Sequence, residues 1–327
     1  DTPAGGDAYL LVPVALVQHG RATQDADAEI GLPMVALMSN ALLFLLIAGM
    51  AGSCDARELR RKFFSKDARG ILAGVVCQYV ILPFFGYLSL GLFPQDSTIA
   101  VTLLLVTTSP GGGFSGVWCS LTNADLALSV AMTTASTIAC IAALPFNVYL
   151  YVKAMYPEMD VEISFEQLAL GVVVVVTAVL FGSSMSWFFN NVHFRQGMNT
   201  LGSAAGVSLM VIGGASNAVS KDPIWENDID WFLCVGLPCV LGLGAALAVA
   251  WLIGLESPAS VAVAIECCYQ NTGLALTIAL SAVPPSEVGK AAGVPLFYGL
   301  IEMALIPVFG ISAWKAGWTY ADKDLPV

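Results

Sequence analysis

Three polar side chains, Glu266, Gln270 and Asn271, lie near the middle of an otherwise apolar run, residues 257–283. The run is long enough to cross a bilayer, where an unpartnered carboxylate costs at least ~2.5–3.5 kcal/mol. Glu266 and Gln270 are four residues apart and share one face of a helix. Gly273 follows, and a helix break there would expose backbone carbonyls beside the carboxylate. These oxygen ligands and their single negative charge suit a small hard cation.

The composition is that of a polytopic membrane protein. Of 327 residues, 57% are hydrophobic and 11% are charged, whereas a soluble domain carries ~25% charged residues. The net charge of −11 gives no indication of nucleic-acid binding. The eight cysteines lie in or beside apolar segments and are expected to be buried small hydrophobes. No nucleophile and base accompany the intramembrane acids, so an enzyme is not expected.

Nine apolar segments have roughly the length of a bilayer span. They are predicted near residues 33–53, 70–93, 98–122, 125–152, 165–189, 199–219, 230–254, 257–283 and 290–315. Residues 1–32 are expected to form an extramembrane arm, and residues 317–327 a tail. The fold class is therefore an all-α, multi-pass integral membrane protein with nine transmembrane helices.

The distribution of basic residues predicts the orientation. Six of the thirteen Lys and Arg residues lie in one short loop: Arg57, Arg60, Arg61, Lys62, Lys66 and Arg69. The positive-inside rule places this loop, and by alternation a loop at 190–198 with His193 and Arg195, on the inner side of the membrane. The N-terminus is then outside and the C-terminus inside. The plasma membrane and organelle envelopes all fit.

Two of the nine segments are predicted to be broken. In the third, Pro110 is followed by three glycines, which cannot continue a regular helix, so a break is expected near 109–115. In the eighth, the break is expected near 270–273. Each half of the chain has one broken helix, and the predicted span count gives the two helices opposite directions across the membrane. This arrangement is typical of an inverted-repeat transporter whose binding site lies where the breaks meet. In the fourth segment, Ser129 and Thr133 share a helix face; such hydroxyls also often bond carbonyls of their own helix.

Two stretches resemble the signature regions of the bile acid:sodium symporter family. SPGGGFSG (109–116) with DLALSVAMTT (125–134) is similar to its S/C-P-G-G-x-x-S-N run and D/N-x-A-L-S-V-x-x-T continuation. AIECCYQNTGLAL (264–276) is similar to its E-x-x-x-Q-N motif, and CQYVILP (77–83) to its glutamine-bearing second segment. The resemblance covers about residues 34–316.

The resemblance implies a core domain with the two crossed, broken helices, here residues 70–154 and 230–316, and a panel domain, here residues 33–53 and 165–219. It also implies two sodium ions behind the crossing. The first would be bound by Ser115, Ser129, Thr133 and Glu266. The second would be bound by Gln78, Glu266, Gln270 and backbone carbonyls near Cys267 and Tyr269.

Two positions depart from the family pattern. Gly116 stands where the family usually has Asn, which removes one amide ligand and puts the first sodium site in doubt. Glu302 stands where relatives carry a neutral polar residue. It could bind a proton, a cation or a cationic substrate group, or simply reach a water-filled cavity.

The function expected from these features is sodium-coupled symport of an organic anion by alternating access. The anion would be a bile acid, a steroid sulfate or a small organic acid, and the other expected partner is membrane lipid. Substrate binding is assigned to Gly112, Gly113 and Phe114, whose amides open the second half-helix, and to Asn271 and Glu302. Two alternatives stay open: a proton-coupled transporter that uses Glu302, and a structural or accessory subunit derived from the family that no longer transports.

Overall fold

The computed structural model is built from helices, and it describes residues 37–38, 40–53, 68–156, 165–189, 191–219, 223–283 and 287–321. Residues 39–327 form one unit, to which the description below applies. Within the described ranges of this unit there is no strand, and the extended backbone pairing is a single bridge between Gly111 and Gln270. The all-α class expected from the sequence is confirmed.

The helices follow one another in the order that the apolar segments predict. They are an Asn40–Ser53 helix, α3 (Ala68–Val76), the π-helix η1 (Cys77–Ile81), α4 (Leu82–Leu92), α5 (Ser97–Thr107), α6 (Ser115–Leu121), α7 (Leu126–Met155), α8 (Phe165–Phe189), α9 (Val192–Ala218), the 3-10 turn η2 (Ile224–Glu226), α10 (Ile229–Leu252), α11 (Ser257–Cys268), α12 (Thr272–Ala282) and α13 (Val288–Lys315).

Among the residues that the structure describes, five stretches of helix are long and apolar enough to cross a membrane. They are Ala68–Leu92, Leu126–Met155, Val192–Ala215, Ile229–Leu252 and Val288–Lys315. Shorter apolar helices stand where the remaining spans are expected, at Asn40–Ser53, Ser97–Thr107, Val173–Phe189 and Ser257–Cys268. The structure thus supports a multi-pass membrane protein. The count of nine stays a prediction, and so does the orientation, because the basic loop lies largely outside the described residues.

Both predicted helix breaks are present. The first separates α5 from α6 and covers residues 108–114, close to the expected 109–115. The second separates α11 from α12 at residues 269–271 rather than 270–273, because Asn271 caps α12 and places Gly273 inside that helix. The Asn271 Oδ1 accepts the Leu274 N–H at 2.9 Å, as an N-cap side chain does.

The predicted loop at 190–198 is wrong. Helix α9 begins at Val192, so His193 and Arg195 lie in its first two turns and the connection to α8 is short. Asn191 accounts for the difference, because its side-chain oxygen accepts the His193 N–H at 2.8 Å and caps the helix early.

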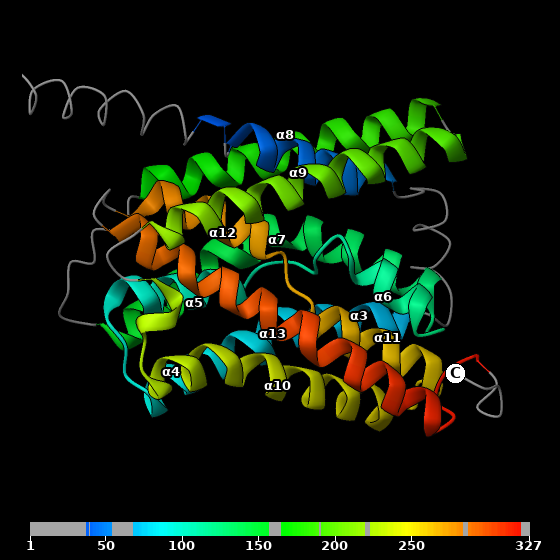
Figure 1. The fold of residues 1–327 in the computed structure, drawn as a ribbon. Coiled ribbons are helices and arrows are strands. Elements are labelled where there is room, and N and C mark those ends of the chain that lie inside the picture. Colours follow the sequence, from blue (N-terminus) through cyan, green and yellow to red (C-terminus); the bar gives the residue numbers. More distant parts are fainter. Residues whose placement is uncertain are drawn as a thin grey trace, which may run out of the picture. The chain divides into compact units, whose positions relative to one another are not determined.

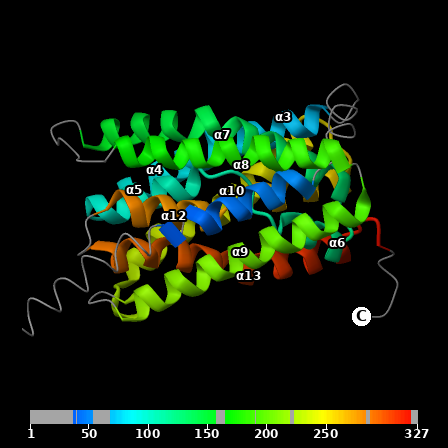
Figure 2. The same cartoon turned by 90° about the horizontal axis from the view of Figure 1, so that it is seen from above.

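The helices run roughly along one direction (Figures 1 and 2). The Asn40–Ser53 helix, α8 and α9 lie along one side of the unit, and α4 and α10 lie along the other (Figure 1). Small residues let the first group pack closely, since a Cβ built on Gly49 would lie 2.5 Å from the Gly202 Cα. The division into core and panel stays a prediction, because α13 packs along α9 as well as along α12.

Candidate functional site

Glu266 is fully buried in α11, and its carboxylate is held by hydroxyls of α7. Ser129 Oγ donates to Oε2 at 2.9 Å, and Thr133 Oγ1 donates to Oε1 at 2.5 Å. Ser115 Oγ lies 3.2 Å from Thr133 Oγ1. Asp125 starts α7 by capping the Leu128 N–H at 2.9 Å, which sets the position of both hydroxyl residues. The structure therefore brings together all four residues predicted for the first sodium site.

The two helix breaks cross directly in front of this carboxylate. The Gly112 N–H donates to the Tyr269 carbonyl at 2.8 Å, and the Asn271 N–H donates to the Pro110 carbonyl at 2.9 Å. These bonds flank the bridge between Gly111 and Gln270. A Cβ on Gly111 would collide with Glu266 Oε1, so only glycine allows this approach.

The crossing changes the role of two residues predicted to bind substrate. The Gly112 amide is bonded to Tyr269, so it is not free to bind an anion, contrary to the expectation. Asn271 is buried, and its side-chain oxygen is bonded to the Leu274 N–H. Both residues form part of the crossing. Their backbone amides are bonded to carbonyls far away in the sequence, and a sequence pattern does not show such bonds.

The second break leaves helix carbonyls without their usual donors. In a continuous helix the amides of Gln270 and Asn271 would bond the carbonyls of Glu266 and Cys267. Here the Gln270 N–H donates to Glu302 and the Asn271 N–H donates to Pro110. Side-chain amides replace them: Gln78 Nε2 donates to the Glu266 carbonyl at 3.0 Å, and Gln270 Nε2 donates to the Cys267 carbonyl at 2.7 Å.

The oxygen ends of the same two side chains are the unusual feature. Gln78 Oε1 and Gln270 Oε1 are buried, and neither has a hydrogen-bond partner within the described part of the chain. Buried amide oxygens are nearly always bonded, because an unmet acceptor in an apolar interior is costly. The carbonyls of Cys267 and Tyr269 each keep a second lone pair. This donor set fits the second predicted sodium site, since all its atoms are oxygens.

Gln78 reaches the site from the π-helix η1, which the sequence did not predict. The amide end of Gln78 lies against Gly111, since a Cβ there would be 2.8 Å from Nε2. A π turn is often found at a functional site because it re-aims one side chain without ending the helix. Pro83 follows soon after, and a proline just beyond a polar residue in an apolar span is the signal available in the sequence.

Glu302 supports the crossing from α13. Its carboxylate accepts the Gln270 N–H at 2.7 Å, and its side chain is only 1% exposed. The residue therefore does not extend into the large cavity described next. Tyr298 lies one turn earlier, with its buried hydroxyl lacking a partner among the described residues. Glu302 acts here as a structural acceptor for the broken end of α11.

A cavity of about 480 Å³ lies beside the crossing. It is bounded by the end of the Asn40–Ser53 helix, the first break with α6, the start of α7 and the first turns of α9. Gly113 and Gly116 line it, and so does Thr133, which also bonds Glu266. The C-terminal end of α9 is bonded to the start of α13, because Asn217 Nδ2 donates to the Gly289 carbonyl at 3.0 Å.

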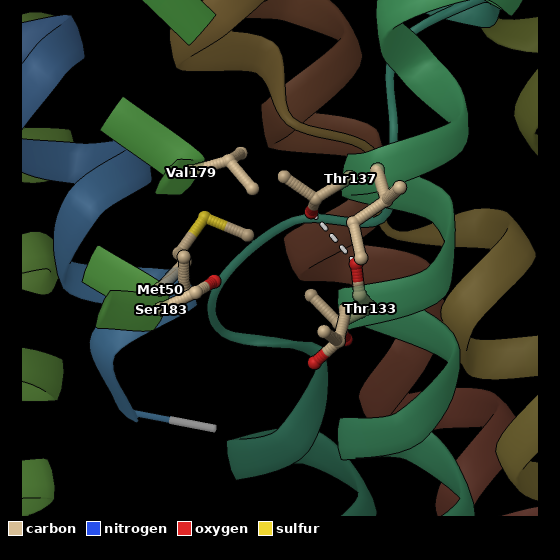
Figure 3. Close-up of a pocket in the computed structure, with 8 residues that line it drawn as sticks. Met50, Thr133, Thr137, Val179 and Ser183 are labelled. Carbon is tan, nitrogen blue, oxygen red and sulfur yellow. Dashed lines mark hydrogen bonds between the residues drawn. The ribbon is translucent and has the colours of Figure 1, made fainter. Parts of the chain in front are cut away.

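A narrow crevice lies beside Thr133, between the Asn40–Ser53 helix, α7 and α8. Figure 3 shows Met50, Val179 and Ser183 gathered opposite Thr133 and Thr137. The Thr137 hydroxyl donates to the Thr133 carbonyl at 2.7 Å, so Thr137 bonds its own helix as such hydroxyls often do. The crevice holds about 10 Å³, at the lower limit for a single water molecule. Met50 and Thr133 line both this crevice and the large cavity.

The sequence prediction missed the part of the cavity wall that α9 provides. Arg195, Gln196 and Asn199 line the cavity, whereas residues 190–198 were expected to form a loop. Arg195 and Asn199 are four residues apart, so they share a helix face. The early cap at Asn191 is the signal that could have extended the helix to include them.

Residues 40–221 match the sodium bile acid symporter family. The human ileal sodium/bile acid cotransporter is 25% identical over 280 residues, which cover 84% of this chain and 79% of that protein. The sodium-dependent organic anion transporter of Bos taurus is 24% identical over 249 residues, and the match spans 75% of this chain and 64% of the bovine protein. The uncharacterized sodium-dependent transporter YocS of Bacillus subtilis (strain 168) is 30% identical over 243 residues, 70% of each chain.

The apolar helices and the matches are those of a family of membrane transporters. The chain belongs to the sodium bile acid symporter family. Its relatives are named for sodium-dependent transport of bile acids and organic anions, and the family is one of transporters rather than enzymes.

Proposed function

We propose that this chain transports an organic anion across a membrane and couples that transport to sodium. The observation that carries the proposal is the fully buried Glu266 beside Gln78 and Gln270, whose buried amide oxygens have no partner in the described ranges. A sodium ion would neutralise the carboxylate and supply the missing partner for both oxygens. The names of the relatives support sodium and an organic anion as the transported species.

The ligands proposed for sodium come from separate elements. Ser129 and Thr133 belong to α7, Gln78 to η1, and Glu266 and Gln270 to α11 and the second break. Ser115, at the start of α6, and the carbonyls of Cys267 and Tyr269 complete the two proposed sites. A cation that bridges these elements favours the crossed arrangement, because without it a buried charge and two amide oxygens stay unpaired.

Substrate coupling follows from the position of Thr133. This residue lines the 480 Å³ cavity and also donates to Glu266, so an anion in the cavity and a cation at the carboxylate would contact the same side chain. Because their charges are opposite, each would raise the affinity of the site for the other, and thermodynamic linkage makes the two effects equal. Movement of the crossed helices against the Asn40–Ser53 helix, α8 and α9 would then open the cavity alternately to each side.

Uptake into vesicles tests the proposal. Proteoliposomes with the full chain are given a radiolabelled bile acid, with an inward sodium gradient or with equal sodium on both sides. Uptake that depends on the gradient, and that is lost in Glu266→Ala, is the expected result. Equal uptake in both conditions, unaffected by Glu266→Ala, would refute sodium coupling.

The same vesicles separate the two alternatives. A proton-coupled transporter would take up the anion under a pH gradient at zero sodium, and Glu302→Gln would abolish that uptake. A structural or accessory subunit would show no uptake, and its melting temperature would not respond to sodium. Sodium-dependent names among the relatives favour sodium over both.

A further inference from the structure

Glu302 is one of two carboxylates buried at the crossing of the helix breaks. Glu266 is 0% exposed and Glu302 is 1% exposed, and no lysine, arginine or histidine is buried in the ranges that the structure describes. A buried charge is costly unless an opposite charge pairs with it. The positive charge that balances two carboxylates here therefore has to come from outside the chain, as bound cations or protons.

Glu302 is held against the second break through a backbone amide. Its Oε1 accepts the Gln270 N–H at 2.7 Å, across 32 positions of the chain. That N–H has lost its helical partner, because α11 ends at Cys268 and the Glu266 carbonyl is bonded by Gln78 Nε2 instead. A carboxylate accepts such a bond more strongly than a neutral oxygen does, since charge-assisted hydrogen bonds are roughly twice as strong. Glu302 therefore fixes the backbone of a residue that is itself a proposed sodium ligand.

The bonded amide belongs to a peptide group whose other end is also a proposed sodium ligand. The Gln270 N–H and the Tyr269 carbonyl are the two ends of one planar peptide unit. The Tyr269 carbonyl accepts the Gly112 N–H at 2.8 Å and keeps a second lone pair. A negative charge at the N–H end polarises the unit and makes its carbonyl oxygen more negative, as in a chain of hydrogen bonds. Groups that bond to the back of a metal ligand in this way raise its basicity and its affinity for the ion.

We propose that Glu302 is a positioning residue for the second sodium site, on which it acts through the peptide between Tyr269 and Gln270 without contacting the ion. It fixes this peptide at the crossing, and it supplies a second negative charge for a second cation. Two carboxylates then balance two sodium ions, whereas a neutral amide in place of Glu302 would leave one carboxylate for both. The assignment rests on the sodium coupling proposed above. It differs from the expectation of substrate or proton binding at Glu302, because the residue is buried and bonded behind the second break.

Sodium binding to the purified full chain in lipid nanodiscs tests the assignment. Glu302→Gln keeps an oxygen that accepts the Gln270 N–H but removes the charge, so the Kd for radiolabelled sodium should rise about 10–100-fold. Its melting temperature in sodium-free buffer should not fall, because the hydrogen bond remains and a buried charge is removed. In vesicles, the sodium concentration for half-maximal uptake should rise while the maximal rate at saturating sodium is retained.

Two further substitutions at the same position separate the charge from the hydrogen bond. Glu302→Leu removes both, so the sodium-free melting temperature should fall as well, since the Gln270 N–H is left buried without a partner. Glu302→Asp keeps the charge on a shorter side chain and should recover part of the sodium affinity that Glu302→Gln loses. A residue with only a structural role would give the wild-type sodium affinity in Glu302→Gln, whose hydrogen bond is intact.

Two controls lie on the same helix, α13. Tyr298→Phe, one turn before Glu302, removes a buried hydroxyl that has no partner within the described ranges, and so changes the helix nearby without changing a charge. Glu287→Gln repeats the chemical change of Glu302→Gln at the partly exposed start of the helix, where the carboxylate lies 3.9 Å from Lys290 Nζ. Both controls should bind sodium like the wild type.

Three results would overturn the assignment. The first is wild-type sodium binding by Glu302→Gln. The second is a sodium-free melting temperature of Glu302→Gln as low as that of Glu302→Leu, which would show a structural role only. The third is uptake driven by a pH gradient at zero sodium and abolished in Glu302→Gln, which would make Glu302 a proton carrier. If the wild type itself binds no sodium, the proposed sodium coupling fails instead, so the two failures are distinguished.

Discussion

Glu266 has two sets of neighbours that differ in how well their own hydrogen bonds are satisfied. The first is a hydroxyl set, Ser115, Ser129 and Thr133, in which the bonds to the carboxylate are already made at 2.9 and 2.5 Å. The second is an amide set, Gln78 and Gln270, in which each side chain has bonded its nitrogen end and left its oxygen buried without a partner in the described chain.

This difference indicates where a cation is needed. If a cation leaves the hydroxyl set, the hydroxyls stay bonded to Glu266. If a cation leaves the amide set, two buried amide oxygens are left without a hydrogen bond. Gly116 adds to the contrast, since it stands beside Ser115 where the family pattern has an amide. We therefore expect the amide set to hold the more tightly bound sodium and the hydroxyl set to hold a weak one.

The largest effect is expected from the residue that both sets share. Glu266→Gln keeps the size of the side chain but removes the charge that attracts a cation to either set. Sodium-driven uptake should fall by roughly 100-fold or more, and the rise of melting temperature with sodium should disappear. Glu256→Gln, at the exposed start of the same helix, is the matched control and should behave like wild type. A sodium response that survives in Glu266→Gln would exclude a site built on this carboxylate.

The next change breaks the amide set alone. Gln270→Leu removes one unpartnered oxygen but also leaves the Cys267 carbonyl without its donor, so the melting temperature in sodium-free buffer should change little. The apparent sodium affinity should fall about 10–100-fold, because a ligand is lost. Gln95→Leu, in the loop between α4 and α5, is the control for the same substitution. An unchanged sodium affinity in Gln270→Leu would show that the amide oxygens do not bind the ion.

The parts of this site that the sequence predicted follow from local rules. A proline before three glycines ends a helix, and a carboxylate in an apolar span needs partners, so the first break and the importance of Glu266 could be read directly. Ser129 and Thr133 share a face because they are four residues apart. The resemblance to a family then placed Ser115, Gln78 and Gln270 near them.

The remaining features depend on long-range contacts. Pairing of Gly111 with Gln270 joins residues far apart in the chain, and it is this pairing that occupies the Gly112 amide and directs the Gln270 amide to Glu302. The π turn carries Gln78, whose amide nitrogen lies beside Gly111 at the same crossing. Arg195 was assigned to a loop because basic residues were used to predict the topology. A basic residue at the start of a helix fits the positive-inside rule equally well.

A hydroxyl substitution should give the opposite pattern from Gln270→Leu. Ser129→Ala removes a bond that is already made, so the melting temperature should fall even in sodium-free buffer, by an amount that corresponds to about 1.5–3 kcal/mol. The sodium affinity should fall only several-fold, because the amide set is intact. Ser312→Ala, whose hydroxyl bonds its own helix on an exposed face, is the control. If Ser129→Ala loses the sodium response and keeps its sodium-free stability, the two sets have been assigned the wrong way round.

The smallest effect is expected from rebuilding the hydroxyl set. Gly116→Asn introduces the amide of the family pattern, and the backbone can accept it because a Cβ there meets neighbours only at ordinary contact distance. An added ligand should strengthen the weak sodium, so the apparent sodium affinity should rise a few-fold and the sodium dependence of uptake should become steeper. Gly116→Leu has a similar size without the amide and separates ligation from crowding of the cavity that Gly116 lines. Because the amide set is expected to hold its ion already, Gly116→Asn should leave uptake at low sodium concentrations unchanged. It should change uptake only at high sodium concentrations. A variant that shifts the whole sodium curve equally would show instead that Gly116 acts on the same ion as Gln270.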